Sequence, residues 1–118
     1  MKKLLLLFSL ISILCGCSAI EYQTHKIELN QQSAVAKLLN ISVNQADNFK
    51  KTGKFASPEE MKWANIEFEG YVIEMKSTDG SFQCWATPKS YGVTGKLSFY
   101  ADSSDGNVHG EDKNGGKT

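Results

Sequence analysis

Two periods of apolar residues divide this chain, a helical period before Gly53 and a strand period after Asn65. The stripe at helical spacing consists of Val35, Leu38, Leu39, Ser42, Ala46 and Phe49, and Ile41 and Val43 widen it. Residues three and four apart share one face of a helix, so the pattern predicts an amphipathic helix that begins near Asn30. Gly53 lies where such a helix ends. An apolar stripe of this length requires a second element to pack on.

A helix-start signal follows at Ser57-Pro58-Glu59-Glu60. Serine caps a helix, proline suits the first helical position, and a glutamate three residues after the cap completes a capping box. We therefore expect a second helix of two turns, with Met61, Ala64 and Trp63 as candidates for its inner face.

After Asn65 apolar and polar residues alternate, which predicts strands at residues 68–76, 82–87 and 96–102 and a short fourth strand at 107–109. Asp79-Gly80 suits a hairpin turn, and Pro88 ends the second strand. The inner face of that strand consists of Phe82, Cys84 and Ala86. The expected fold class is α+β, with an N-terminal amphipathic helix packed on a 3–4-stranded antiparallel meander sheet. The glycine-rich residues 110–118 are expected to fray.

The N-terminus has a separate pattern. Two lysines precede an apolar run from Leu4 to Leu14, which is shorter than the roughly 20 residues that a membrane-spanning helix needs. A charged start and a short apolar run are typical of a secretory signal. The next residues, Leu14-Cys15-Gly16-Cys17, resemble the lipobox of bacterial lipoproteins. This resemblance implies cleavage between Gly16 and Cys17 and acylation of Cys17; the alternative is an ordinary secretory signal.

The lipobox divides the chain into a signal peptide (1–16), a lipidated tether (17–29), a folded domain (30–112) and a flexible tail (113–118). Two or three acyl chains on Cys17 suffice for lasting membrane attachment, whereas one chain binds only marginally. Ser18 after the cysteine resembles the outer-membrane sorting signal of Gram-negative bacteria. The expected location is the cell envelope, at the outer membrane if the host is Gram-negative.

The amino-acid composition limits the classes of partner that the chain is expected to bind. All thirteen cationic residues are lysine, so the chain lacks the arginine forks that phosphate and base recognition favour, and we do not expect nucleic-acid binding. Once the signal is removed, Cys84 is the one cysteine beside the acylated Cys17. An intramolecular disulfide is then impossible. A strand cysteine of this kind is commonly buried, and we expect a monomeric mature domain.

Several motifs between residues 33 and 113 occur in the order found in one known family. A strand ends in Ala86-Thr87-Pro88, a loop carries Thr94-Gly95, an aromatic strand ends at Asp102, and a turn holds Gly106. This set resembles the globular head of type IV pilin-like proteins, the pseudopilins. In that family a long apolar stem follows the cleavage site, with a glutamate as its fifth residue. Here the apolar segment precedes the cut and no stem follows Glu21, so we expect a pilin-like head that does not polymerise.

Candidate chemistry is sparse. Cys84 with His25 or His109 contains the parts of a thiol nucleophile and base, yet no glycine-rich nucleophile turn surrounds the cysteine. Carboxylates near the C-terminal loop, namely Asp102, Asp105, Glu111 and Asp112, are weak calcium candidates, suggested also by the calcium loops of some pseudopilins. The simpler interpretation is a solvated acidic loop. Glu67, Glu69 and Glu74 fit the wet face of an edge strand.

Trp85 and Tyr100 lie on the strand face opposite Cys84, with Val72 beside them. If only the helix covers the sheet, these side chains form an exposed contact surface for protein or glycan. If a second layer such as the loop at Tyr91 covers them, they belong to the core, and the pattern leaves both interpretations open.

Together these features favour a non-enzymatic, lipid-anchored envelope lipoprotein without a cofactor. It would act as an adhesion, scaffold or envelope-assembly component, with envelope, pilus or secretion proteins as partners. The alternative is a periplasmic binding or inhibitor module for a soluble ligand or hydrolase.

Overall fold

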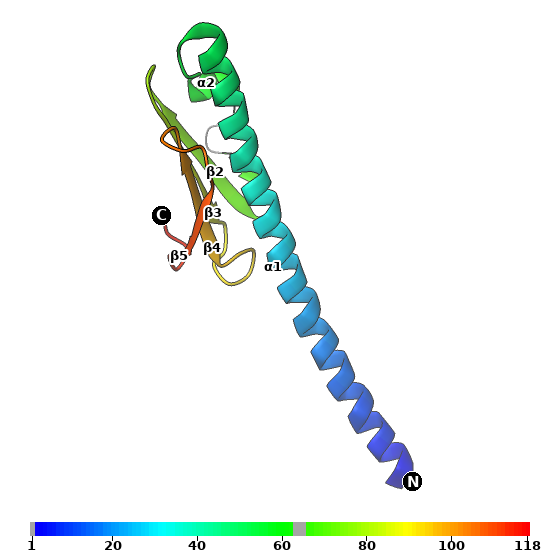
Figure 1. Cartoon of the computed structure of the whole chain (residues 1–118). Helices are drawn as coiled ribbons and strands as arrows, with labels where there is room; N and C mark the ends of the chain where they lie inside the picture. Colours follow the sequence, from blue (N-terminus) through cyan, green and yellow to red (C-terminus); the bar gives the residue numbers. More distant parts are fainter. Residues whose placement is uncertain (1, 63–65) are drawn as a thin grey trace.

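The computed structural model describes residues 2–62 and 66–118, with side chains described for residues 22–62 and 66–118. One long helix, α1 (Lys2–Thr52), lies across one face of an antiparallel sheet (Figure 1). The remaining elements are α2 (Pro58–Met61), β1 (Ile66–Phe68), β2 (Tyr71–Ser77), β3 (Phe82–Pro88), β4 (Leu97–Asp102) and β5 (His109–Asp112). The strands pair in sequence order, β1-β2-β3-β4-β5, as a meander. The α+β class is confirmed, with five strands in place of the expected three or four.

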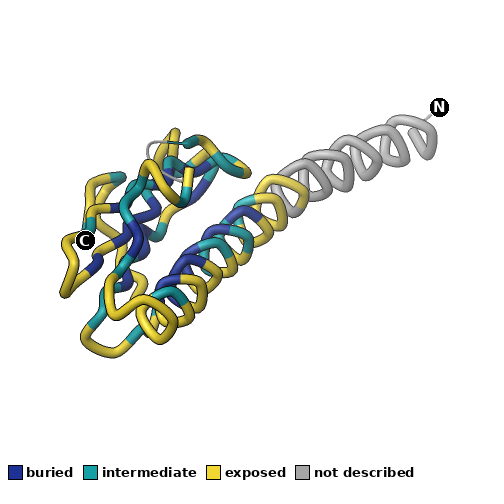
Figure 2. The backbone as a smooth tube through the Cα atoms, turned by 90° about the horizontal axis from the view of Figure 1, so that it is seen from above, coloured by how far each residue is buried: buried dark blue, intermediate teal, exposed yellow. Residues whose placement is uncertain are grey.

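The inner face of α1 covers the centre of the sheet. Ala34, Leu38 and Ile41 are fully buried, and Figure 2 shows the buried positions of the helix along one side. They pack in one core cluster with Tyr71, Ile73, Met75, Phe82, Cys84, Ala86, Phe99 and Ala101. The inward assignment of Cys84, Phe82 and Ala86 is therefore confirmed.

The buried stripe is narrower than the sequence pattern indicated. Leu39, Val43 and Phe49 are 44%, 64% and 43% exposed, so the expectation that Leu39 and Phe49 point into the core is wrong. Adjacent helical residues differ by about 100° in direction, and a sheet contacts only one line of them. Of the neighbouring pair Leu38 and Leu39, one therefore faces the sheet and the other faces solvent.

Gln45 continues the buried stripe although it is polar. Its side chain is fully buried, its Nε2 donates to Ala56 O at 2.8 Å, and its Oε1 accepts from Ala56 N at 2.7 Å. Both hydrogen-bonding ends of the amide are thus satisfied by one backbone unit, as burial requires. The pair ties the segment after α1 back against the helix.

The helix-terminus signals are confirmed at both positions. Gly53 has a φ of +78° and its N–H donates to Phe49 O, which ends α1. Ser57 Oγ accepts from Glu60 N at 3.2 Å, with Pro58 at the first helical position of α2. The second helix has one turn in place of two, and Met61 is partly buried against the core. Trp63 and Ala64 lie outside the described residues.

Three boundaries differ from the expectation. Residues 22–29, expected as a tether, continue α1. The single strand expected at 68–76 is divided, because Glu69 and Gly70 both have positive φ and form a hairpin turn between β1 and β2. The fourth strand of the expectation is shifted to His109–Asp112, so the tail expected to fray contains a strand that pairs with β4.

The loop between β3 and β4 approaches the sheet at a glycine. A Cβ added to Gly95 would lie 2.2 Å from Tyr71 Oη, whose hydroxyl donates to Leu97 O at 2.7 Å. Tyr71 is fully buried in the core cluster. The loop can therefore close over Tyr71 only because residue 95 lacks a side chain.

A pair of truncations on α1 tests the helix–sheet interface. Leu38→Ala should lower the free energy of unfolding by about 2–5 kcal/mol, because it leaves a cavity in the core. Val43→Ala, on the exposed side of the same helix, should change it by less than about 0.5 kcal/mol. Urea melts of the two variants measure the difference, and similar small effects would contradict the packing of α1 on the sheet.

A pair of glycine substitutions tests the close approach of the loop. Gly95→Ala should destabilise the fold by about 1–3 kcal/mol, because the new methyl group overlaps the Tyr71 hydroxyl. Gly80→Ala is the matched control, since an added Cβ there meets nothing within 4 Å. Thermal unfolding compares the two, and equal midpoints would show that the loop does not sit on Tyr71.

Candidate functional site

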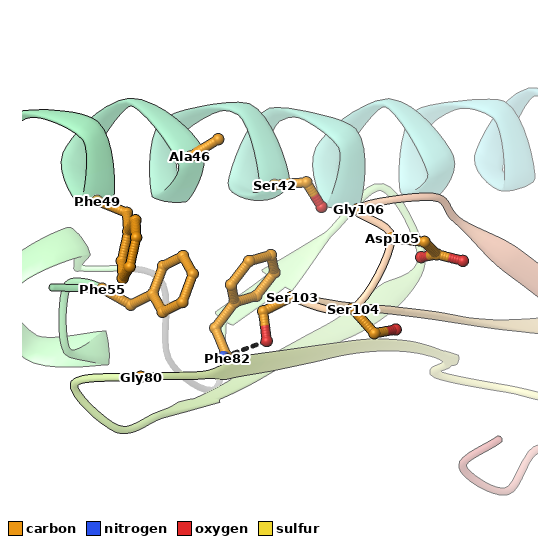
Figure 3. Close-up of a pocket in the computed structure, with 10 residues that line it drawn as sticks. All are labelled: Ser42, Ala46, Phe49, Phe55, Gly80, Phe82, Ser103, Ser104, Asp105 and Gly106. Carbon is orange, nitrogen blue, oxygen red and sulfur yellow. Dashed lines mark hydrogen bonds between the residues drawn. The ribbon is translucent and has the colours of Figure 1, made fainter. Parts of the chain in front are cut away.

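One described feature that can receive a ligand is a cleft beneath the C-terminal part of α1. It has a volume of about 540 Å³, within the range of about 300–1,000 Å³ common for ligand sites. The helix forms its roof, and the turns after β2 and β4 form its floor and one end (Figure 3). The lining residues are Ser42, Ala46, Phe49, Phe55, Gly80, Phe82, Ser103, Ser104, Asp105 and Gly106.

Three aromatic rings form the apolar end of this cleft. The rings of Phe49 and Phe55 are stacked with centroids 4.6 Å apart, and Phe82 meets Phe55 edge-on at 5.1 Å. The chain folds this way because Gly53 ends the helix and the Gln45–Ala56 hydrogen bonds turn the segment back beneath it. Phe49 remains 43% exposed, so its ring is available to a ligand.

The opposite end of the cleft is polar and acidic. Asp105 Oδ1 accepts from Asn107 N at 2.9 Å, and its Oδ2 lies 3.0 Å from His109 Nε2. The hydrogen bond from Asn107, followed by that from His109, lowers the pKa of Asp105 below its ordinary value, so the carboxylate is charged at neutral pH. Ser42 is 7% exposed, and its buried Oγ has no hydrogen-bond partner among the described residues.

The calcium candidates do not converge. Asp102 pairs with Gln83 at one end of β4, whereas Asp112 pairs with Leu97 at the other end of the same strand. Asp102 also accepts hydrogen bonds from Ser104 and Tyr100, and these lower its pKa. No cluster of three metal-ligating side chains occurs in the described residues. The hypothesis that Asp102, Asp105 and Asp112 form one calcium site is therefore wrong.

Trp85 lies on the outer face of the sheet but is not an open contact surface. It is only 9% exposed, with Lys117 Nζ 5.0 Å and Lys76 Nζ 5.9 Å from its ring centroid. Tyr100 is half-buried beside it, at 5.7 Å between centroids. The contact-surface interpretation of Trp85 is thus wrong, and the second-layer interpretation holds.

The second layer is the C-terminal segment, which the sequence predicted to be a flexible tail. Ser98 Oγ donates to Gly116 O at 2.6 Å, and Lys117 forms an ion pair with Glu74 at 2.5 Å. The loop at Tyr91 supports this segment, because the Tyr91 hydroxyl donates to Asp112. The C-terminal segment covers Trp85 with its backbone and with the aliphatic part of a lysine side chain, and it has no large apolar residue of its own. Its sequence therefore shows no apolar pattern that would predict this packing.

Cys84 is not a nucleophile in this fold. Its side chain is fully buried, and burial raises the pKa of its thiol to about 12. A thiol of that pKa is protonated at neutral pH, and the thiolate is the reactive form. His109 bonds Asp105, and His25 is exposed on α1, so the structure does not place a histidine on the thiol.

A row of mostly apolar residues on α1 is left uncovered by the sheet, which the sequence pattern did not indicate. Its members recur at alternating spacings of three and four: Leu29, Gln32, Ala36, Leu39, Val43 and Ala46, all exposed. Leu29, Leu39 and Val43 are 48%, 44% and 64% exposed. Such a 3-4 repeat is the pattern that a second helix packs against. Three of its members, Leu39, Val43 and Ala46, were interpreted in the sequence as part of a broad inner stripe, which concealed this row.

Comparisons with family models, curated proteins and solved structures find no match for this chain. Within the described residues, no helix is long and apolar enough to cross a membrane. The lipidation residues Gly16 and Cys17 lie outside the residues whose side chains are described. The lipid anchor at Cys17 therefore stays a prediction from the sequence.

Thiol reactivity tests the burial of Cys84. In the folded mature chain, modification by a disulfide reagent at pH 8 should be at least roughly a hundredfold slower than in urea, because the thiol is enclosed and protonated. Ser81→Cys, in the exposed hairpin turn, provides an accessible thiol in the same chain as a control. Rapid labelling of Cys84 without denaturant would show that the strand faces solvent.

Proposed function

We propose that this chain is a non-enzymatic lipoprotein of the bacterial cell envelope, anchored by lipid on Cys17. The support is the sequence of the first seventeen residues, where a charged start, a short apolar run and Leu14-Cys15-Gly16-Cys17 follow one another. The mature chain begins at Cys17, and its lipid holds the folded domain at a membrane surface. In a Gram-negative host Ser18 favours the outer membrane.

The folded domain acts, in this proposal, by binding another envelope protein as a scaffold, adhesion or assembly component. The observation that supports this is the exposed row along α1 described above. Its members Leu29, Leu39 and Val43 expose apolar surface that the sheet does not cover, at the spacing of a helix–helix seam. The occupant that fits this spacing is an α-helix of the partner protein, packed along α1.

The resemblance to pilin-like proteins supports the same role. A long helix on one face of an antiparallel meander agrees with the resemblance carried by residues 33–113. The proposal keeps one difference from pilins: cleavage before Cys17 removes the apolar segment of residues 4–14, and with it the stem by which pilin subunits pack. The mature domain is proposed to be a monomer that associates with such assemblies and does not build them.

A second candidate function is a binding module for a soluble ligand. The cleft with stacked Phe49 and Phe55 at one end and Asp105 at the other favours it. This candidate is compatible with the lipid anchor, because the cleft lies under the C-terminal end of α1, away from the N-terminus (Figure 1).

Acylation is tested with a matched pair of cysteine variants. Cys17→Ser should abolish incorporation of a fatty-acid probe and leave the signal uncut, because the acyl acceptor is lost. Cys15→Ser, two residues earlier, should be labelled and processed as the unaltered chain is. Gel fluorescence after metabolic labelling measures probe incorporation in both variants. Labelling of Cys17→Ser would eliminate the lipoprotein proposal.

Partner binding is tested by photo-crosslinking in cells. A photoreactive phenylalanine analogue at Val43 should give a discrete crosslinked band, since this is the most exposed of the large apolar residues in the proposed seam. The same analogue at Gln83, exposed on the outer face of the sheet, should give none. If neither position crosslinks, or if both give the same band, the outer face of α1 is not the binding surface.

A further inference from the structure

The C-terminal segment, residues 113–118, crosses the outer face of the sheet as a strap. It contains only lysine, asparagine, glycine and threonine, so no large apolar side chain of its own holds it in place. Gly116 O accepts from Ser98 Oγ of β4 at 2.6 Å, and Lys117 reaches Glu74 of β2. Figure 1 shows the C-terminus on the side of the sheet away from α1. The strap therefore spans several strands and is held by polar contacts.

Lys117 makes the charged contacts of this strap. Its Nζ lies 2.5 Å from Glu74 Oε2 and 5.0 Å from the centroid of the Trp85 ring. The side chains of Lys117 and Glu74 remain 44% and 26% exposed, so dissolved ions reach both. Ion pairs and cation–π contacts between partly exposed groups contribute little to stability, and salt weakens the ion pair further. The closed position of the strap therefore depends on contacts that ionic strength controls.

Two features of the strap oppose its closure. Asn114 has a φ of +54°, a backbone conformation that is uncommon for residues other than glycine. Thr118 Oγ1 is enclosed without a hydrogen-bond partner among the described residues, and water would satisfy it once the strap lifted. Gly115 and Gly116 lie between these residues and give the backbone the freedom to move. The closed state thus combines weak polar contacts with local costs that an open state relieves.

We propose that the strap opens and closes reversibly over the outer face of the sheet, with Lys117 as its latch. When it opens, the Lys117 ammonium group is hydrated, and the Trp85 ring and the Glu74 carboxylate become accessible together. Salt favours the open state because it screens the ion pair. The inference goes beyond the proposed function and depends neither on the lipid anchor nor on α1, which packs on the other face of the sheet.

Acrylamide quenching of Trp85 fluorescence tests the strap, in the full chain in detergent micelles. A Trp63→Phe background leaves Trp85 as the one tryptophan. The quenching constant should rise roughly threefold between about 10 mM and about 1 M sodium chloride, because the Debye length falls from about 30 Å to about 3 Å. Acrylamide is neutral, so salt does not change its own approach. A constant that ignores salt, or that equals the value in urea at both salt concentrations, would overturn the proposal.

Matched lysine variants identify the latch. Lys117→Gln should raise the quenching constant at low salt roughly threefold and remove most of its salt dependence, because the ion pair with Glu74 is lost. Lys113→Gln is the control within the strap, since Lys113 pairs with Glu111 at 3.4 Å and should leave the salt response unchanged. Equal quenching of Lys117→Gln and the unaltered strap would show that Lys117 is not the latch.

A second measurement keeps Trp63 and separates opening of the strap from loosening of the whole fold. The indole N–H of Trp85 is followed by NMR hydrogen exchange in the isotope-labelled full chain and assigned by its loss in Trp85→Phe. Salt should accelerate its exchange roughly threefold and leave the backbone amide of Ile73, in the buried core, unchanged. Equal acceleration at both sites, or at neither, would refute the strap.

Discussion

The contact between the inner line of α1 and the sheet is the interaction on which the other described features depend. Leu38 and Ile41 are fully buried against strands that are far from them in sequence. Because this line is narrow, it leaves much of the helix surface uncovered, including the exposed row that contains Leu39 and Val43. Burial of one face thus generates both the core and the surface proposed for partner binding.

Gln45 extends that contact to the segment after the helix. Its two hydrogen bonds to Ala56 hold the returning chain under α1, and Phe55 is thereby stacked on Phe49. The turn between β4 and β5 closes the other end of the same cleft with Asp105. One buried amide and one surface turn therefore place an aromatic end and an acidic end in a single cavity.

The two functional ideas have independent physical bases. The envelope proposal depends on covalent chemistry at Cys17 and on an exposed apolar helix face. The second candidate function depends on the cleft with the stacked rings of Phe49 and Phe55.

Local patterns were enough to predict the α+β class, the meander order, the end of α1 at Gly53, the cap at Ser57 and the inward side of Cys84. These features depend on local backbone preference or on a period of two, both of which are visible in a short stretch of sequence. Folding had to be known before it was clear which of Leu38 and Leu39 is buried, that Gln45 is a core residue, and that the C-terminal segment covers Trp85. It also separated Asp102 from Asp112 and brought Asp105 to the Phe49–Phe55 cleft. Each of these features depends on contacts between residues that are distant in the chain. A buried polar side chain gains its hydrogen-bond partner only when the chain folds, so the local sequence does not identify that partner.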